Sequence, residues 1–227
     1  MGGVSDQATA GNQRPARKQQ QRSIVTQQKL LDAAVQAFSE SGFKGTSTRD
    51  IADRAGVHHP LITYHFKNKD QLWRASADRI FREFNISLVK AVAEVPESRP
   101  KARAETFIRT YVRYAHDQPA LHKFILQESS HPSDRLDWLV EQHLKPLFDI
   151  VVQSLRELQD RGIAPPGDPA ILFNMIRVSA GGLLALSEEI KGTSDIDFTS
   201  EAALDELADM IIRCFLPGDE ARETAVS

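Results

Sequence analysis

The segment TSTRDIADRAGVHHPLITYHFKNKDQLW, residues 46–73, decides how this chain folds. Ser47, with an acidic residue three positions later, forms an N-cap pattern that predicts a helix over 48–55. Gly56 then supplies a turn, because glycine adopts left-handed backbone angles at little cost. A helix of only two turns follows, with Pro60 in its first turn, where a missing N–H is tolerated. The segment therefore predicts two short helices around a glycine turn.

Two short helices joined in this way are typical of a helix-turn-helix. Ala52 must be small because the two helices cross closely there, and Ile51, Val57 and Ile62 are expected to form the buried contact that fixes the crossing angle. The second helix is about 10 Å long at about 1.5 Å per residue, so a major groove about 12 Å wide admits it. We therefore expect residues 58–65 to face outward and to read DNA.

The histidines in this segment raise two other possibilities, a metal site and a catalytic cluster. Histidine ligands on one helix usually stand four residues apart, and no cysteine or carboxylate completes a set with His58, His59 and His65. No Ser or Cys nucleophile has a recognisable setting nearby. We therefore expect no metal, no cofactor and no catalysis, and we expect His59 to donate to a base edge or a phosphate. For His65, simple packing beside Phe66 is an open alternative.

The rest of the sequence is helical in pattern up to residue 215, without two-residue alternation. In the first helix, Ile24, Leu31, Val35 and Phe38 share one face. Breaks rich in Pro, Gly and Asp separate the later segments. Those segments fall near 69–93, 101–117, 119–130, 134–161, 168–190 and 200–215. The expected fold class is all-α, with about nine helices.

The charge is divided unevenly along the chain. Up to residue 79 there are 12 Lys and Arg against 7 Asp and Glu, whereas from residue 80 onward there are 16 against 24. A basic first part joined to an acidic remainder favours a polyanionic partner for the first part. The single cysteine, Cys214, excludes an internal disulfide. With no apolar run of 18 residues and no secretory pattern, we expect a cytoplasmic protein without a membrane partner.

The motifs TSTRDIADRAGV, YHF and KNKDQL together resemble the signature of the TetR family of bacterial transcriptional regulators. The resemblance covers about one eighth of the chain and is highly specific in combination. It implies a three-helix DNA-binding domain at 22–68 and a ligand-binding and dimerisation domain at 69–217. Outside these domains we expect a disordered basic tail at 1–21 and a second disordered tail at 218–227.

The resemblance also implies roles for individual residues. Thr48 and Arg49 match the family's groove and phosphate contacts at the start of the first motif helix. Tyr64 and Lys69 match backbone contacts. The recognition helix would present His58, His59, Pro60, Leu61 and Thr63. The aromatic residue stands one position later than is usual in the family, so whether Thr63 or Tyr64 reaches phosphate stays open.

In the remainder, Gly181 and Gly182 lie inside an apolar helix at a cost of about 1 kcal/mol each, which suggests a close backbone approach or a ligand cavity. The resemblance implies an effector pocket between the middle helices and a dimer interface built from 168–190 and 200–215. Polar residues among apolar ones in this part are Tyr111, His116, His122, Glu128, Trp138, His143, Asn174 and Arg177. The preferred effector contacts are Phe124, Trp138, His143 and Arg177. Arg177 would pair with an anionic ligand or with Glu128.

These expectations add up to a homodimeric, sequence-specific DNA-binding regulator. It would be a repressor of a palindromic operator, controlled by a small and mostly apolar effector, and it would not be an enzyme. Two alternatives are weighed against this reading. One is an architectural DNA-binding protein without an effector, and the other is a small helical enzyme, which lacks a recognisable nucleophile, base or metal set.

Overall fold

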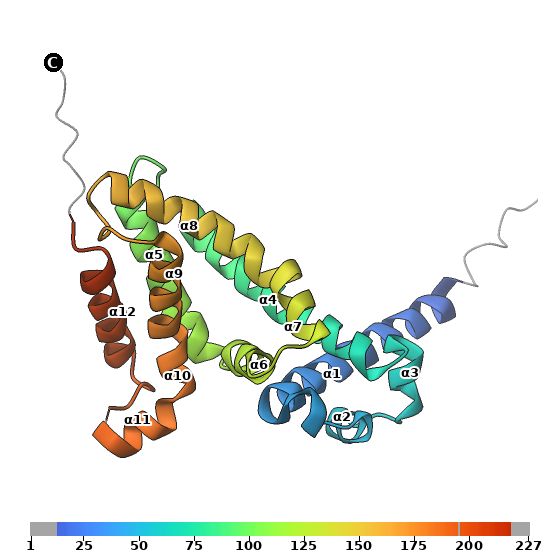
Figure 1. Ribbon diagram of the computed structural model, residues 1–227. Coiled ribbons are helices and arrows are strands. Elements are labelled where there is room, and N and C mark those ends of the chain that lie inside the picture. The colour runs from blue at the N-terminus through green and yellow to red at the C-terminus, as the bar shows by residue number, and fades with distance from the viewer. Residues whose placement is uncertain (1–12, 195, 219–227) are drawn as a thin grey trace, which may run out of the picture. The chain divides into compact units, whose positions relative to one another are not determined.

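The computed structural model describes residues 13–194 and 196–218, and every regular element in these ranges is a helix (Figure 1). The expected all-α fold class is confirmed. The described chain divides into two compact units, one ending at Ser76 and the other beginning at Ala77. The expected tail at 218–227 and the first part of the tail at 1–21 lie outside the described residues, apart from Gly218.

The first helix, α1 (Gln13–Gly45), begins earlier than the sequence pattern indicated. Residues 13–21, expected to belong to a disordered tail, are helical. The predicted face is only partly right, because Phe38 is buried whereas Ile24 is 41% exposed. Leu30, rather than Ile24, begins the buried side of the helix. Side chains at 19–29 are therefore largely solvated, and only the second half of α1 packs into the core of its unit.

The two motif helices are α2 (Thr48–Ala55) and α3 (Pro60–Phe66). The Ser47 hydroxyl accepts the backbone N–H of Asp50 at 3.1 Å, and the Asp50 carboxylate accepts the N–H of Ser47 at 3.3 Å, which completes the expected capping box. Gly56 ends α2 in a left-handed conformation, with φ 63°. Sequence and structure agree here because the determinants are local.

Helix α4 (Lys69–Ala93) follows at once and contributes residues to both units. Asn68 caps its start by accepting the N–H of Gln71 at 2.8 Å. In the first unit, the core includes Ile51, Ala52 and Ile62 and also Leu72 and Trp73, all at most 2% exposed. Val57, expected to be part of the buried contact, is only half-buried.

The second unit continues with α5 (Pro100–Asp117) and α6 (Ala120–Ser129). The expected helix over 134–161 is divided into α7 (Asp134–Leu139), the π-helix η1 (Val140–Leu144) and α8 (Lys145–Asp160). Pro146 stands in the first turn of α8, directly after the wider π turn, and it has no N–H to donate.

The expected helix over 168–190 is also divided. It consists of α9 (Pro169–Arg177), the π-helix η2 (Val178–Gly182) and α10 (Leu183–Ala185). A bend of 77° then leads into α11 (Ser187–Ser194). Among the described residues no single helix is long and apolar enough to cross a membrane, although this bent pair passes by length and composition.

The last helix, α12 (Glu201–Phe215), packs against α5. Leu204, Leu207, Ala208 and Ile211 are buried within the subunit, so most of the stripe assigned to a dimer interface is core instead. The stripe faces inward because α5 offers apolar side chains such as Ile108 and Val112.

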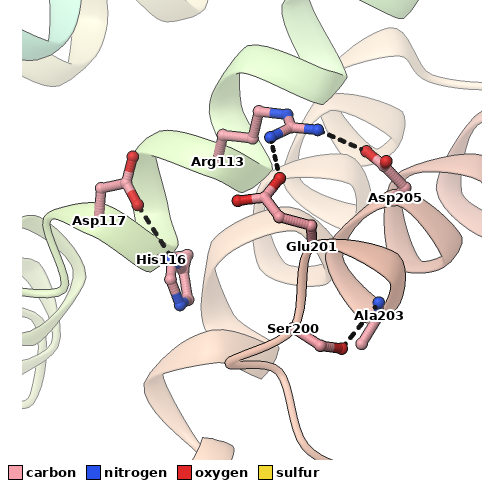
Figure 2. Close-up of polar contacts among 7 residues, drawn as sticks. All are labelled: Arg113, His116, Asp117, Ser200, Glu201, Ala203 and Asp205. Atoms are coloured by element: carbon pink, nitrogen blue, oxygen red, sulfur yellow. Dashed lines mark hydrogen bonds and ion pairs between the residues drawn. The ribbon is translucent and has the colours of Figure 1, made fainter.

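Ion pairs flank this packing (Figure 2). The Arg113 guanidinium donates to the carboxylate of Glu201 and, at 2.7 Å, to that of Asp205. One helical turn away, Arg109 donates to Asp209. The pairing of Arg113 with both carboxylates raises its already high pKa.

Candidate DNA-binding surface and effector site

The recognition helix presents an outward face, as the sequence predicted. His58, His59, Pro60 and Thr63 are exposed, and Tyr64 is 75% exposed. The expected outward placement is confirmed for these residues, whereas Leu61 is half-buried.

The opposite side of α3 is buried in the core of the first unit. Ile62 and Phe66, four residues apart, are 2% and 6% exposed and anchor it to the core of the unit. A rigid helix with one buried and one solvated side can present fixed side chains to a groove.

Helix α2 positions one of the two histidines. The Thr48 hydroxyl and His59 Nε2 are 2.9 Å apart, so the start of α2 is hydrogen-bonded to the start of α3. Arg49 is exposed beside this pair, and hydrogen bonding from Ser47 lowers the pKa of Asp50. The arrangement orients the imidazole of His59 while leaving the Arg49 guanidinium in solvent.

Two lysines near the end of α3 add to this surface, one of them expected to contact the DNA backbone and the other not. The Lys69 ammonium lies 4.3 Å from the centre of the Phe43 ring, a cation–π contact with α1, and Lys69 is half-buried. Lys67, which the sequence reasoning passed over, is exposed three positions after Tyr64 and has a positive φ of 63°. The turn between α3 and α4 places Lys67 at a positive φ, a conformation that sequence patterns usually assign to glycine.

His65 is half-buried and packs between its neighbours. Its ring centre lies 4.9 Å from that of Tyr64, edge to face, and 6.2 Å from that of Phe66. Burial lowers the pKa of His65. No group of three or more His, Cys, Asp or Glu side chains within the described ranges could hold a metal ion.

The second unit contains a small enclosed cavity of about 30 Å³ between α4, α5, α6, η1, α8 and α9. Two of the four preferred effector contacts, His143 and Arg177, line it. Phe124 is 1% exposed and Trp138 is half-buried, and neither lines the cavity. Aromatic rings from α4 and α5 form much of its wall, namely Phe81, Phe84, Phe107 and Tyr111.

His143 is fixed in this cavity by three contacts. Its Nε2 lies 2.9 Å from the Asp78 carboxylate, its ring stacks on Phe81 with centres 4.8 Å apart, and Trp138 meets its edge at 5.2 Å. Burial lowers the pKa of His143, and Asp78 partly opposes that shift. Trp138 therefore supports a cavity residue.

A second buried pair lies behind the cavity wall. The Tyr111 hydroxyl and His122 Nε2 are 2.9 Å apart, and His122 Nδ1 has no hydrogen-bond partner in the described structure. Burial, aided by the positive charge of Arg177, lowers the pKa of His122 to about 4. Burial also raises the pKa of Tyr111. Both groups are therefore neutral at pH 7.

Arg177 is the charged residue in the lining of the cavity. Its guanidinium donates to the Asn174 side chain at 3.3 Å, and within the described part of the chain it forms no ion pair with a carboxylate. Glu128, the alternative partner considered from the sequence, pairs instead with Arg135 at 3.1 Å. The carboxylate of Glu128 is therefore already compensated by Arg135.

An open groove of about 620 Å³ adjoins the cavity. Helices α4, α5 and α8 form most of it, and its lining is largely aliphatic. Phe107, Leu147 and Ile176 line both the groove and the cavity, so these three side chains form the partition between them. A volume of this size is within the range of small-molecule sites, about 300–1,000 Å³.

Sequence reasoning did not single out the aromatic wall or Asp78. Phe81, Phe84 and Leu88 follow helical spacing, so the sequence assigns them to an ordinary core stripe. Tyr111 and His122 were noted as polar residues among apolar ones but were not preferred. Their pairing depends on how α5 and α6 pack, which no local pattern encodes.

Taken with this geometry, comparison with known proteins defines the class as a helix-turn-helix transcriptional regulator that binds DNA. Residues 30–75 match the family described as bacterial regulatory proteins, tetR family. The resemblance to the TetR family of bacterial transcriptional regulators, drawn from the sequence motifs, is thus confirmed over the helix-turn-helix unit.

Relatives extend the similarity beyond the DNA-binding unit. The chain is 24% identical to the HTH-type transcriptional regulator RutR of Escherichia coli over 202 residues, which is 88% of this chain and 94% of RutR. It is 30% identical to the class D tetracycline repressor protein of Escherichia coli over 90 residues, 40% of this chain and 41% of that protein.

Among solved structures, AibR in complex with isovaleryl coenzyme A and operator DNA has the same fold. The TM-score is 0.69 at 17% identity, covering 86% of this chain and all of AibR. This likeness establishes the architecture over most of the chain.

Proposed function

We propose that the protein is a homodimeric repressor that binds a palindromic operator through α3 and releases it when a small effector occupies the second unit. The observation that carries the proposal is the recognition helix α3. Its buried side anchors it to the core, and its other side is exposed at the end of a capped helix-turn-helix. In this proposal residues 22–68 bind DNA, residues 69–217 bind the effector and the second subunit, and the protein works in the cytoplasm.

The DNA contacts divide into two kinds. His59, oriented by Thr48, reads base edges together with His58, Pro60, Leu61 and Thr63. Arg49, Tyr64 and Lys69 bind the phosphate backbone and supply the salt-dependent part of the affinity. Tyr64, at 75% exposure, is assigned to the phosphate backbone, and Thr63, which is also exposed, to a base edge.

Two features support a dimer: the short recognition helix α3, and an exposed apolar surface on α9, η2 and α12. Helix α3 has seven residues and reads only a few base pairs, so two copies are needed for a selective site. Ile171, Met175 and Val178 on α9 and η2 are each more than half exposed, and Met210 on the neighbouring α12 is 52% exposed. We propose that these four residues form the centre of the interface.

The effector is proposed to bind in the groove and the adjoining cavity, where His143 and Arg177 are the polar contacts. AibR, a protein of the same fold, forms a complex with isovaleryl coenzyme A and operator DNA. Helix α4 lines the groove with Leu88 and Val89 and starts at Lys69, three residues after α3 ends. Displacement of α4 would thus act on the recognition helix, with a coupling of about 1–3 kcal/mol.

The proposal is tested by selecting binding sites from random duplex DNA and then measuring salt dependence. A palindromic consensus with half-sites about 34 Å apart, or a multiple of this, and a steep salt slope are expected. Arg49→Ala should weaken binding to all sequences alike. A steep slope without any sequence preference would instead support the architectural alternative.

A further inference from the structure

The groove and the cavity differ in chemistry, and the difference indicates what kind of molecule they accept. The groove is largely aliphatic, whereas the lining of the cavity includes Arg177 and Tyr111. A ligand that spans both spaces therefore needs an apolar body and one polar end.

Among the described residues that line the cavity, Arg177 supplies the only charge, which is positive. Arg177 forms no ion pair among the described residues, and His122, Tyr111 and His143 all have pKa shifts that keep them neutral at pH 7. The Asp78 carboxylate hydrogen-bonds to His143 but does not line the cavity. A half-buried cation without a counter-ion is an unfavourable state that an anionic ligand relieves.

Both π-helical segments of the described chain include or adjoin residues that line the cavity. Helix η1 contributes His143 and Leu144 to the cavity wall, and η2 begins directly after Arg177. Such segments are energetically poor and occur frequently at functional sites. Their position here is independent of the charge argument and points to the same place.

We propose that the effector is an amphipathic monocarboxylic acid, with its aliphatic chain in the groove and its carboxylate on Arg177 and the Tyr111 hydroxyl. Phe107, Leu147 and Ile176 separate the two spaces and move apart when the acid enters. A phosphate or a coenzyme A conjugate is disfavoured, because one guanidinium matches one negative charge and the cavity has room for only a small head group. The inference rests on the proposed function, since it names the ligand class of the same site.

The test is calorimetric titration of the full-length protein, without DNA, with straight-chain carboxylates of 6, 10 and 14 carbons and with their methyl esters. At least one acid should bind, and about 10- to 100-fold more tightly than its ester. Acyl coenzyme A thioesters and alkyl phosphates of the same chain lengths should bind more weakly than the acid. If none of the acids binds, or if the esters, thioesters or phosphates bind as well as the acids, the inference is wrong.

Substitutions at Arg177 test whether the carboxylate of the ligand binds to this residue. Arg177→Gln should weaken acid binding about 10- to 100-fold and leave ester binding unchanged, whereas Arg177→Lys should retain part of the affinity. Arg156→Gln is the matched control, because Arg156 is exposed on α8 and lines neither space. Equal acid affinity in Arg177→Gln and the wild type would overturn the assignment.

This outcome is separable from that of the proposed function. If a neutral compound binds and releases operator DNA while no acid binds, the repressor proposal stands and the ligand class is wrong. If an acid binds through Arg177 without changing operator affinity, the ligand class stands and the coupling to DNA is wrong.

Discussion

The backbone of Gly181 lies directly against the imidazole of His122. A Cβ atom placed on Gly181 would stand 1.8 Å from His122 Nε2, far inside van der Waals contact. The ring is itself 6% exposed and bonded to Tyr111, so it has little freedom to move away. This explains a glycine in the middle of an apolar segment, where the sequence suggested a close backbone approach or a ligand cavity without indicating the neighbour.

Gly181→Ala is accordingly expected to lower the free energy of unfolding by about 1–3 kcal/mol, because the added methyl group overpacks a buried site. Gly182→Ala is the matched control, since its Cβ would meet only the Val178 side chain at 3.3 Å. Urea denaturation at one fixed protein concentration measures both. A Gly181→Ala variant as stable as Gly182→Ala would contradict the proposed close contact.

Acidification should destabilise the protein through His122. The folded-state pKa of about 4 lies below the unfolded value of about 6.5, so the neutral ring contributes stability that is present above pH 6.5 and lost as the pH falls toward 4. The loss is about 3 kcal/mol at most. The unfolding free energy of His122→Gln should therefore fall less between pH 7 and pH 5 than that of the wild type. Parallel pH profiles would show that His122 is not held neutral.

Thr48 and His59 should act as one unit in DNA recognition. His59→Ala is expected to change the preference at particular bases by about 1–3 kcal/mol. Thr48→Val should reproduce part of this change, because it removes the hydroxyl that holds the ring at 2.9 Å. The double variant should then be no worse than His59→Ala alone. Fully additive effects on the affinities of a set of single-base operator variants would argue against the coupling.

The interface between α5 and α12 should depend on its apolar side chains rather than on its ion pairs. Arg113 is 46% exposed and its partners Glu201 and Asp205 more so, and therefore Arg113→Gln should cost no more than about 1 kcal/mol. Leu204→Ala, a deletion from the buried side of α12, should cost about 2–5 kcal/mol. Thermal and urea unfolding of both variants measure which substitution costs more stability. A larger loss of unfolding free energy for Arg113→Gln than for Leu204→Ala would show that the ion pairs dominate the interface.

The helix-turn-helix could be predicted almost completely because its determinants are close together in the sequence. The capping box at Ser47, the turn at Gly56 and the proline in the first turn of α3 act over three or four residues. Exposure of the recognition helix followed from the alternation of Ile62 and Phe66 with polar side chains. Prediction failed at the half-buried Val57, which depends on how the helices pack, and at the start of α1, where a polar segment without apolar periodicity is helical.

The second unit was less predictable. The apolar stripe of α12 fits either a subunit interface or an internal helix pair, and only the packing against α5 makes it core. Of the four effector contacts expected from the sequence, His143 and Arg177 line the cavity, whereas Phe124 and Trp138 do not.

By itself the sequence determined the all-helical class and the DNA-reading element, since capping, turn chemistry and helical periodicity are local properties of neighbouring residues. Only the tertiary structure decided that His122 meets Tyr111 and Gly181, that Arg177 is left without a carboxylate, and that the groove adjoins the cavity. Those relationships join residues at least 11 positions apart, and they are set by which helices pack together and at what rotation about their axes.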